Sequence, residues 1–139
     1  MTNIPEFINA IPSPALLIES IRDIGYSIET AISDLIDNSI SAKANNIYIN
    51  LNDDDSENIF LEIVDDGHGM NRQDLIQAMT IGAKDPRIAR DKDDLGRFGL
   101  GLKTASFSQC RKLTVESNTK GEINSFTWDL DLVREKNNW

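Results

Sequence analysis

A glycine-rich segment, Gly96 to Thr104, has the composition of a backbone that closes around phosphate. It contains three glycines in six residues and then Lys103-Thr104. Glycine lets the main chain approach a ligand because it has no Cβ, and the free N–H groups of a following helix start attract anions. The Walker pattern of phosphate loops is not met, because Leu102 intervenes between Gly101 and Lys103 and a charged stretch precedes the segment.

Two other places carry groups that suit a nucleotide. Asp34 and Asn38 lie four residues apart in a segment of helical periodicity, so they share one polar stripe with Ser41. Asp65 follows an apolar strand and begins the run Asp-Asp-Gly-His-Gly. A carboxylate at a strand end can accept a hydrogen bond from an exocyclic amine, which would select adenine over guanine.

The chemistry of the remaining groups fits a triphosphate. The Asn38 amide oxygen is a hard ligand that suits Mg²⁺, and the Asp34 carboxylate could polarise a water for attack on a γ-phosphate. Backbone amides and Lys103 would hold the phosphate oxygens.

Each of these residues also has a purely structural interpretation. Asp34 and Asn38 could belong to a solvated helix face, and Asp65 could be a turn residue. His68, the single histidine, lies between two turn glycines and is expected to be a loop side chain. Cys110 has no histidine near it in sequence and is expected to be a packed thiol.

Helices are expected wherever apolar residues recur every three or four positions. The clearest runs from Ser27, a natural N-cap, to Ser41, and others are expected over Pro14–Asp23, Asn71–Met79 and Leu102–Gln109. The expected buried stripe of the clearest helix comprises Ile28, Ala31, Ile32, Leu35, Ile36 and Ile40.

Strands are expected over 47–52, 59–64, 112–118 and 122–130, the last with Phe126, Trp128 and Leu130 on one face. Alternation in the second strand makes Ile59, Leu61 and Ile63 the core-facing set. Asp65 then continues toward the helices, whereas Asp66 points to solvent.

Two polar stretches separate these elements. Residues 53–58 are rich in acids but lack the spacing and the glycine of an EF-hand, so a plain hairpin turn is expected. Residues 83–95 are charged and poor in apolar side chains, and their position directly before the glycines favours a mobile lid.

Composition limits the class of protein. With 139 residues, 40% of them hydrophobic, the chain is expected to form one domain over 1–139. Its net charge of −9 argues against direct nucleic-acid binding, which needs a basic surface. No membrane segment or signal pattern is found, and the single Cys110 fits a reducing compartment, so we expect a cytoplasmic protein.

The three candidate places occur in an order that resembles a known superfamily. Residues 34–39, 65–70 and 96–106 resemble the N, G1 and G2 boxes of the GHKL ATPases. That superfamily includes gyrase B subunits, ninety-kilodalton heat-shock chaperones, histidine kinases and MutL proteins, and the run Gly96 to Lys103 looks most like MutL-like and microrchidia-like members. The resemblance implies a Bergerat-type α/β fold, a two-layer sandwich with helices on one face of a mixed, mostly antiparallel sheet, and an ATP lid.

The resemblance also implies roles for individual residues. Asp34 would be the general base and Asn38 the Mg²⁺ ligand, while Asp65 would bind adenine. The other residues implied to bind ATP or ADP are Gly67, Gly69, Met70, Gly96, Arg97, Phe98, Gly99, Leu100, Gly101, Leu102, Lys103 and Thr104.

The leading expectation is Mg²⁺-dependent ATP hydrolysis that drives a conformational change in a larger protein. The resemblance to MutL-like and microrchidia-like members also implies an ATP-dependent homodimer. Many family members have Glu where this chain has Asp34, which keeps open an ATP-sensing module without hydrolysis. A histidine-kinase-type phosphotransfer domain is a third alternative. The family domain continues into a further strand after the point where this sequence ends, so the chain is expected to be truncated at its C-terminal side.

Overall fold

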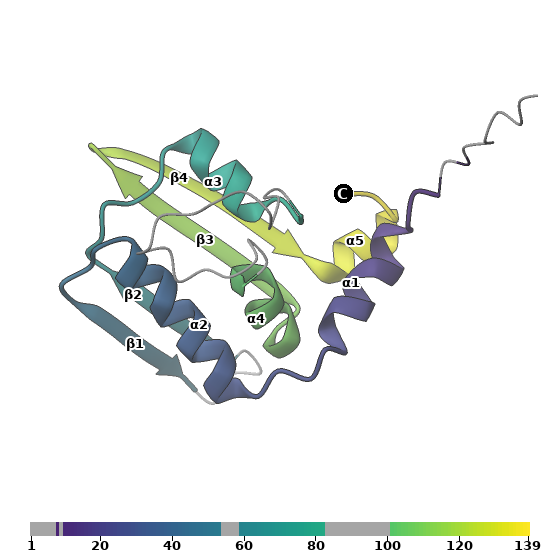
Figure 1. Cartoon of the computed structure of the whole chain (residues 1–139), viewed down its shortest axis with the longest axis horizontal. Coiled ribbons are helices and arrows are strands. Elements are labelled where there is room, and N and C mark those ends of the chain that lie inside the picture. Colours follow the sequence, from purple (N-terminus) through teal and green to yellow (C-terminus); the bar gives the residue numbers. More distant parts are fainter. Residues whose placement is uncertain (1–7, 9, 54–58, 83–100) are drawn as a thin grey trace, which may run out of the picture.

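Two antiparallel hairpins provide the β-structure, and five helices accompany them (Figure 1). The computed structural model describes residues 8, 10–53, 59–82 and 101–139. In chain order the elements are α1 (Pro14–Arg22), α2 (Ile28–Ser41), β1 (Ile47–Asn52), β2 (Phe60–Asp65), α3 (Arg72–Met79), α4 (Gly101–Gln109), β3 (Lys112–Thr119), β4 (Glu122–Asp129) and α5 (Leu130–Lys136).

Side-chain caps explain where three of the helices begin. The Ser27 side chain accepts a hydrogen bond from the Thr30 N–H at the start of α2, and Asn71 accepts one from the Asp74 N–H at the start of α3. Asp129 accepts from two backbone N–H groups of the first turn of α5. Each cap satisfies N–H groups that have no partner within the helix.

The register of each hairpin is continuous. Ile47 pairs with Asp65 and Asn52 with Phe60 across β1 and β2. Lys112 pairs with Asp129 across β3 and β4, and the Lys120-Gly121 loop closes this hairpin. Both loop residues have positive φ, 51° and 83°, which is the conformation of the type I′ turn that matches the twist of a hairpin.

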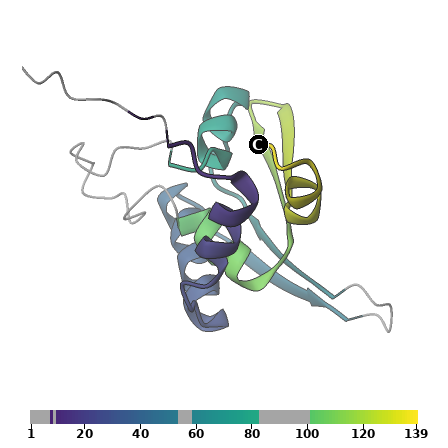
Figure 2. The same cartoon turned by 90° about the vertical axis from the view of Figure 1, so that its right-hand side faces the viewer.

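Helices α2, α3 and α4 lie on the same side of the hairpins, as the two views in Figures 1 and 2 show. α2 contacts β2, α4 contacts β3 and α3 contacts β4, while α2 and α4 pack against each other. The described strands form two separate two-stranded sheets rather than the single mixed sheet that the sequence led us to expect. The mixed α/β class is confirmed.

The main apolar core lies where α1, α4 and α5 meet. Ile18, Phe107, Leu130 and Val133 are buried together, and the Trp128 ring meets Phe107 edge-on with 6.1 Å between ring centroids. No helix in the described parts of the chain has the length and apolar character needed to cross a membrane.

The end of β4 differs from the expectation. The strand ends at Asp129, and Leu130 begins α5 instead of continuing the strand. Alternation alone carried the expected strand to Leu130, but the cap that Asp129 provides turns the chain into a helix at that point. Leu130 is still buried, now in the helical core.

The expected apolar faces are only partly buried. On α2, Ile28 and Ile40 are exposed, whereas Ala31 and Ser39 are the buried positions. On β2 and just before it, Leu61 and Ile59 are exposed, the latter by 68%. Of the three residues expected to face the core from this strand, only Ile63 is partly buried.

Candidate functional site

Helix α2 carries the first group of predicted site residues. Asp34 is half-buried, and its Oδ2 accepts a hydrogen bond of 2.8 Å from the Tyr26 hydroxyl. Asn38, one turn further along, is exposed. The Ser41 Oγ is buried without a hydrogen-bond partner among the residues that the structure describes. The stripe therefore contains a fixed carboxylate, an accessible amide and a buried hydroxyl.

The Asp65 carboxylate is bound to this same helix. Its Oδ2 accepts a 2.9 Å hydrogen bond from the Ser39 hydroxyl of α2, and its Oδ1 accepts a 2.9 Å bond from the Gly67 N–H. The expectation from strand alternation, that Asp65 points toward the helices, is confirmed. Each carboxylate oxygen keeps a further lone pair for a ligand.

Asp66 is exposed, as expected, but it has a structural task. Its Oδ1 accepts hydrogen bonds from the backbone N–H groups of Asn45 and Asn46, and its Oδ2 accepts from the Asn46 amide. These bonds, with the Asn46 backbone as the largest cause, lower the pKa of Asp66 below its ordinary value. Asp66 thus fixes the backbone of Asn45 and Asn46 just before β1, and these hydrogen bonds occupy both of its carboxylate oxygens.

The turn after Asp65 is closed tightly by its glycines. A Cβ on Gly67 would lie 2.7 Å from the Ala42 Cβ and 2.8 Å from the Ala42 carbonyl oxygen. Gly69 has φ +68°, and a Cβ there would overlap the Asn118 carbonyl of β3. The Met70 N–H donates a 2.8 Å hydrogen bond to the buried Ser117 hydroxyl of β3. The turn is therefore held between α2 and β3.

The glycine-rich segment is described only from Gly101. The predicted lid and the predicted binding residues Gly96, Arg97, Phe98, Gly99 and Leu100 lie outside the described residues. Gly101 begins α4, one residue earlier than expected, and a Cβ there would meet no atom of the described residues within 4 Å.

Lys103 and Thr104 are buried in the first turn of α4, and Leu102 is half-buried. The Lys103 side chain is only 2% exposed, and its Nζ donates hydrogen bonds to the carbonyl oxygens of Ala78, at 2.6 Å, and Thr80, at 3.0 Å. The ammonium group thus stabilises the carbonyl end of α3. Its role toward phosphate stays a prediction.

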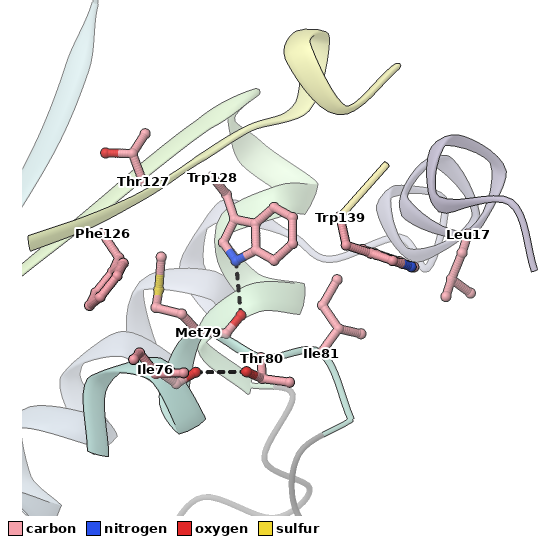
Figure 3. Close-up of a pocket in the computed structure, with 9 residues that line it drawn as sticks. All are labelled: Leu17, Ile76, Met79, Thr80, Ile81, Phe126, Thr127, Trp128 and Trp139. Carbon is pink, nitrogen blue, oxygen red and sulfur yellow. Dashed lines mark hydrogen bonds between the residues drawn. The ribbon is translucent and has the colours of Figure 1, made fainter. Parts of the chain in front are cut away.

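A cavity of about 570 Å³ lies elsewhere, between α3, β4 and the C-terminal residues (Figure 3). Its walls are mainly apolar, and two of its polar groups are already bonded: the Trp128 Nε1 donates to the Met79 carbonyl, and the Thr80 hydroxyl donates to the Ile76 carbonyl. None of the predicted site residues that the structure describes lines this cavity. The described residues of its lining carry no charge that could bind a triphosphate, so the candidate site lies at α2 and the turn after β2.

Two side chains with reactive groups, Cys110 and His68, make hydrogen-bonding contacts with nearby backbone carbonyl groups. The Cys110 thiol donates to the Ser106 carbonyl, and burial raises its pKa, as expected for a packed thiol. The His68 Nδ1 lies 2.8 Å from the Gly69 carbonyl oxygen in an exposed loop. Within residues 8, 10–53, 59–82 and 101–139, no three His, Cys, Asp or Glu side chains form a group that could hold a metal ion.

Two residues of the site were missed from the sequence. Ser39 orients Asp65 through its hydroxyl group. The sequence contained one indication of this role: Ser39 follows Leu35 by four residues and Ala31 by eight, so it is a polar residue in an apolar helical stripe. Tyr26 bonds Asp34, but it lies just before the helix, and no spacing rule connects the two residues.

Comparison with known proteins shows the family of this chain. Residues 26–139 match the sequence profile described as histidine kinase-, DNA gyrase B- and HSP90-like ATPase. Over 94 residues, 68% of this chain, it is 36% identical to ATPase morc-1 of Caenorhabditis elegans. Over 93 residues, 60% of the chain, it is 34% identical to the chaperone protein HtpG of Rickettsia typhi. The chain spans 10% and 14% of the lengths of these two proteins. Because the profile covers most of the chain, the protein belongs to the histidine kinase-, DNA gyrase B- and HSP90-like (GHKL) ATPase family.

Proposed function

We propose that the chain binds ATP with Mg²⁺ and hydrolyses it, with Asp34 as the general base and Asp65 as the adenine ligand. The observation that carries this proposal is the 2.9 Å bond from Ser39 to Asp65. It ties the candidate base-binding carboxylate at the end of β2 to α2, the helix that carries Asp34 and Asn38, so the three candidate groups are held by two elements that are bonded to each other.

The geometry of the turn supports adenine binding at Asp65. A Cβ on Gly67 would lie 2.8 Å from the Asp65 Oδ1, so the glycine allows the carboxylate to keep this position, while Gly69 packs directly against the Asn118 carbonyl of β3. Each Asp65 oxygen already accepts one hydrogen bond, which orients the carboxylate and leaves lone pairs for an amino group.

The residues present also fit Mg²⁺. This ion is usually held by one or two protein oxygens plus phosphate oxygens and water, and the exposed Asn38 amide supplies one such oxygen. When bound, Mg²⁺ neutralises charge on the phosphates. Asp34 would accept the proton of the attacking water, and N–H groups at the start of α4 would bind phosphate oxygens.

Calorimetry and turnover measurements test the proposal. ATP and ADP are titrated into the protein in Mg²⁺, with GTP as the comparison for adenine selection. We expect Asp65→Ala to abolish binding, and Asp34→Ala to keep binding while phosphate release falls to background. Glu29→Gln, an exposed acid on the same helix, is the matched control and should behave as the wild type.

A second candidate function, ATP sensing without hydrolysis, is favoured by one observation. The Asp34 side chain is short, and one of its two oxygens already bonds Tyr26. Under this alternative, wild type, Asp34→Ala and Asp34→Glu would bind ATP alike and release phosphate at the same background rate. A higher rate in the wild type than in Asp34→Ala excludes it.

The wider context of the site belongs to the proposal as well. We propose the two-layer Bergerat arrangement for the complete domain, closure of residues 83–95 over the nucleotide, and an ATP-dependent homodimer that drives a conformational change in a larger protein. The support is the family and the relatives of which this chain covers a small part. Light scattering with ADP and with a non-hydrolysable ATP analogue would detect a dimer that only the triphosphate form induces.

A further inference from the structure

We infer that Tyr26 is a positioning residue for the Asp34 carboxylate, holding Oδ2 so that Oδ1 is the oxygen presented to the attacking water. This inference rests on the proposed function, because it explains how the hydrogen bond from Tyr26 would orient Asp34, the proposed general base.

The contact is short and specific. The Tyr26 hydroxyl donates to the Asp34 Oδ2 at 2.8 Å in a partly buried environment. The same bond to Asp34 is the largest cause that raises the pKa of the Tyr26 phenol above its ordinary value, with burial second. The phenol therefore stays protonated and remains a donor at neutral pH.

The tyrosine is itself held at two points. Its backbone carbonyl accepts a 2.9 Å hydrogen bond from the Gln109 side chain at the end of α4, and the next residue, Ser27, is the N-cap of α2. Tyr26 thus lies between the start of the helix that carries Asp34 and the end of the helix that begins at Gly101. Its position depends on how these two helices pack.

Positioning matters here because an aspartate has one torsion fewer and a shorter reach than a glutamate. A carboxylate that rotates freely offers either oxygen in many directions, whereas a hydrogen bond to Oδ2 limits the directions open to Oδ1. Misplacement of a catalytic group by about 1 Å can lower a rate by about 10²-fold. A residue that fixes the rotation of Asp34 should therefore affect turnover without affecting nucleotide binding.

Tyr26→Phe removes the hydroxyl and keeps the ring. We expect kcat for ATP hydrolysis to fall about tenfold, a part of the loss that misplacement can cause, with KM and the Kd of ADP unchanged. Tyr48→Phe is the matched control, since Tyr48 is the only other tyrosine and is exposed on β1. It should keep wild-type kcat.

A double-mutant cycle separates positioning from a general structural role. In the Asp34→Ala background, Tyr26→Phe should cause no further loss, because the group that it positions is gone. The inference is overturned if Tyr26→Phe keeps kcat within twofold of wild type, if it raises KM in place of lowering kcat, or if it lowers the rate by the same factor with and without Asp34.

The cycle also distinguishes this inference from the proposed function. If Asp34→Ala is as active as the wild type, the proposed base is wrong and the inference falls with it. If Asp34→Ala is inactive and Tyr26→Phe is fully active, only the inference falls. A measurement without turnover is ultraviolet titration of the phenols: Asp34→Asn should lower the Tyr26 pKa toward its ordinary value, and an unaltered Tyr26 titration overturns the inference.

Discussion

Two hydroxyl groups orient the two carboxylates of the site. The Ser39 hydroxyl bonds Asp65 and the Tyr26 hydroxyl bonds Asp34, at 2.9 Å and 2.8 Å. Both donors come from α2 or from the residues just before it. At the scale of single residues, each of the two carboxylates accepts a hydrogen bond from a hydroxyl group and keeps further lone pairs for a ligand.

Ser39→Ala tests the bond to Asp65. We expect the Kd of ADP to rise about tenfold, since a hydrogen bond to a charged group contributes about 1.5 kcal/mol or more, while the Gly67 N–H still holds the other oxygen. The measurement is calorimetry. Ser33→Ala, on the exposed side of the same helix with its hydroxyl bonded to the Glu29 carbonyl, should leave the Kd unchanged. Equal ADP affinity in Ser39→Ala and wild type would contradict the role of Ser39.

The placement of the candidate residues on a helix and at a strand end could be predicted, but the residues that orient the two carboxylates could not. Asp34, Asn38 and Asp65 stand at positions where a helix period or a strand end indicates their chemistry. The partners Ser39 and Tyr26 become partners only through packing, since the Ser39–Asp65 bond spans 26 residues of sequence. Side-chain contacts between distant elements have no periodic signature.

At the scale of elements, the turn after β2 depends on β3. Gly69 is in the left-handed region and packs directly on the Asn118 carbonyl, and Met70 bonds Ser117. Two adjacent residues of β3 thus define the path of the chain that follows Asp65. The turn that we propose to bind adenine is thus held by contacts with β3 as well as by its own glycines.

Gly69→Ala should destabilise the protein strongly. An alanine at positive φ costs about 1 kcal/mol, and here the added methyl group also displaces the β3 backbone. Gly82→Ala is a matched control, because Gly82 has φ +72° but a methyl group added there would meet no atom within 4 Å among the described residues. Thermal unfolding should show a decrease in Tm for Gly69→Ala at least twice that for Gly82→Ala. Equal decreases would mean that the contact with Asn118 adds nothing.

Elements with local signals were predicted well. Caps and apolar spacing located α2 and α3, and alternation located the strands. The failures have non-local causes: α5 replaces the expected end of β4 because the Asp129 cap outweighs alternation, and the separation of the hairpins into two sheets depends on which strand edges meet. Sequence spacing within one strand carries no information about its neighbours across a sheet.

At the scale of the molecule, one cluster joins the two ends of the chain. Ile18 from α1, Phe107 from α4 and Leu130 with Val133 from α5 form the core. The Arg22 guanidinium adds hydrogen bonds to the carbonyl oxygens of Phe107 and Cys110 at the end of α4. The helix that carries the predicted phosphate-binding start is thus anchored at its far end by the first and last helices.

Leu130→Ala should lower the free energy of unfolding by about 2–5 kcal/mol, as for other large-to-small changes in a core. Leu132→Ala is the control on the same helix, since Leu132 is exposed, and should stay within about 0.5 kcal/mol of wild type. Urea unfolding followed by circular dichroism gives both values. Similar values for the two variants would show that α5 does not contribute to the core.

The chain contains two tryptophans, and both lie in the corner next to α3. Trp128 and Trp139 meet edge-on with 6.2 Å between ring centroids, and the Trp128 indole donates to the last residue of α3, Met79. All indole emission of the protein therefore originates beside the end of that helix. Intrinsic fluorescence is a label-free optical probe of the α3–β4 contact: loss of the indole hydrogen bond to Met79 and entry of water would shift the emission to longer wavelength, without any dye attached near Asp34 or Asp65.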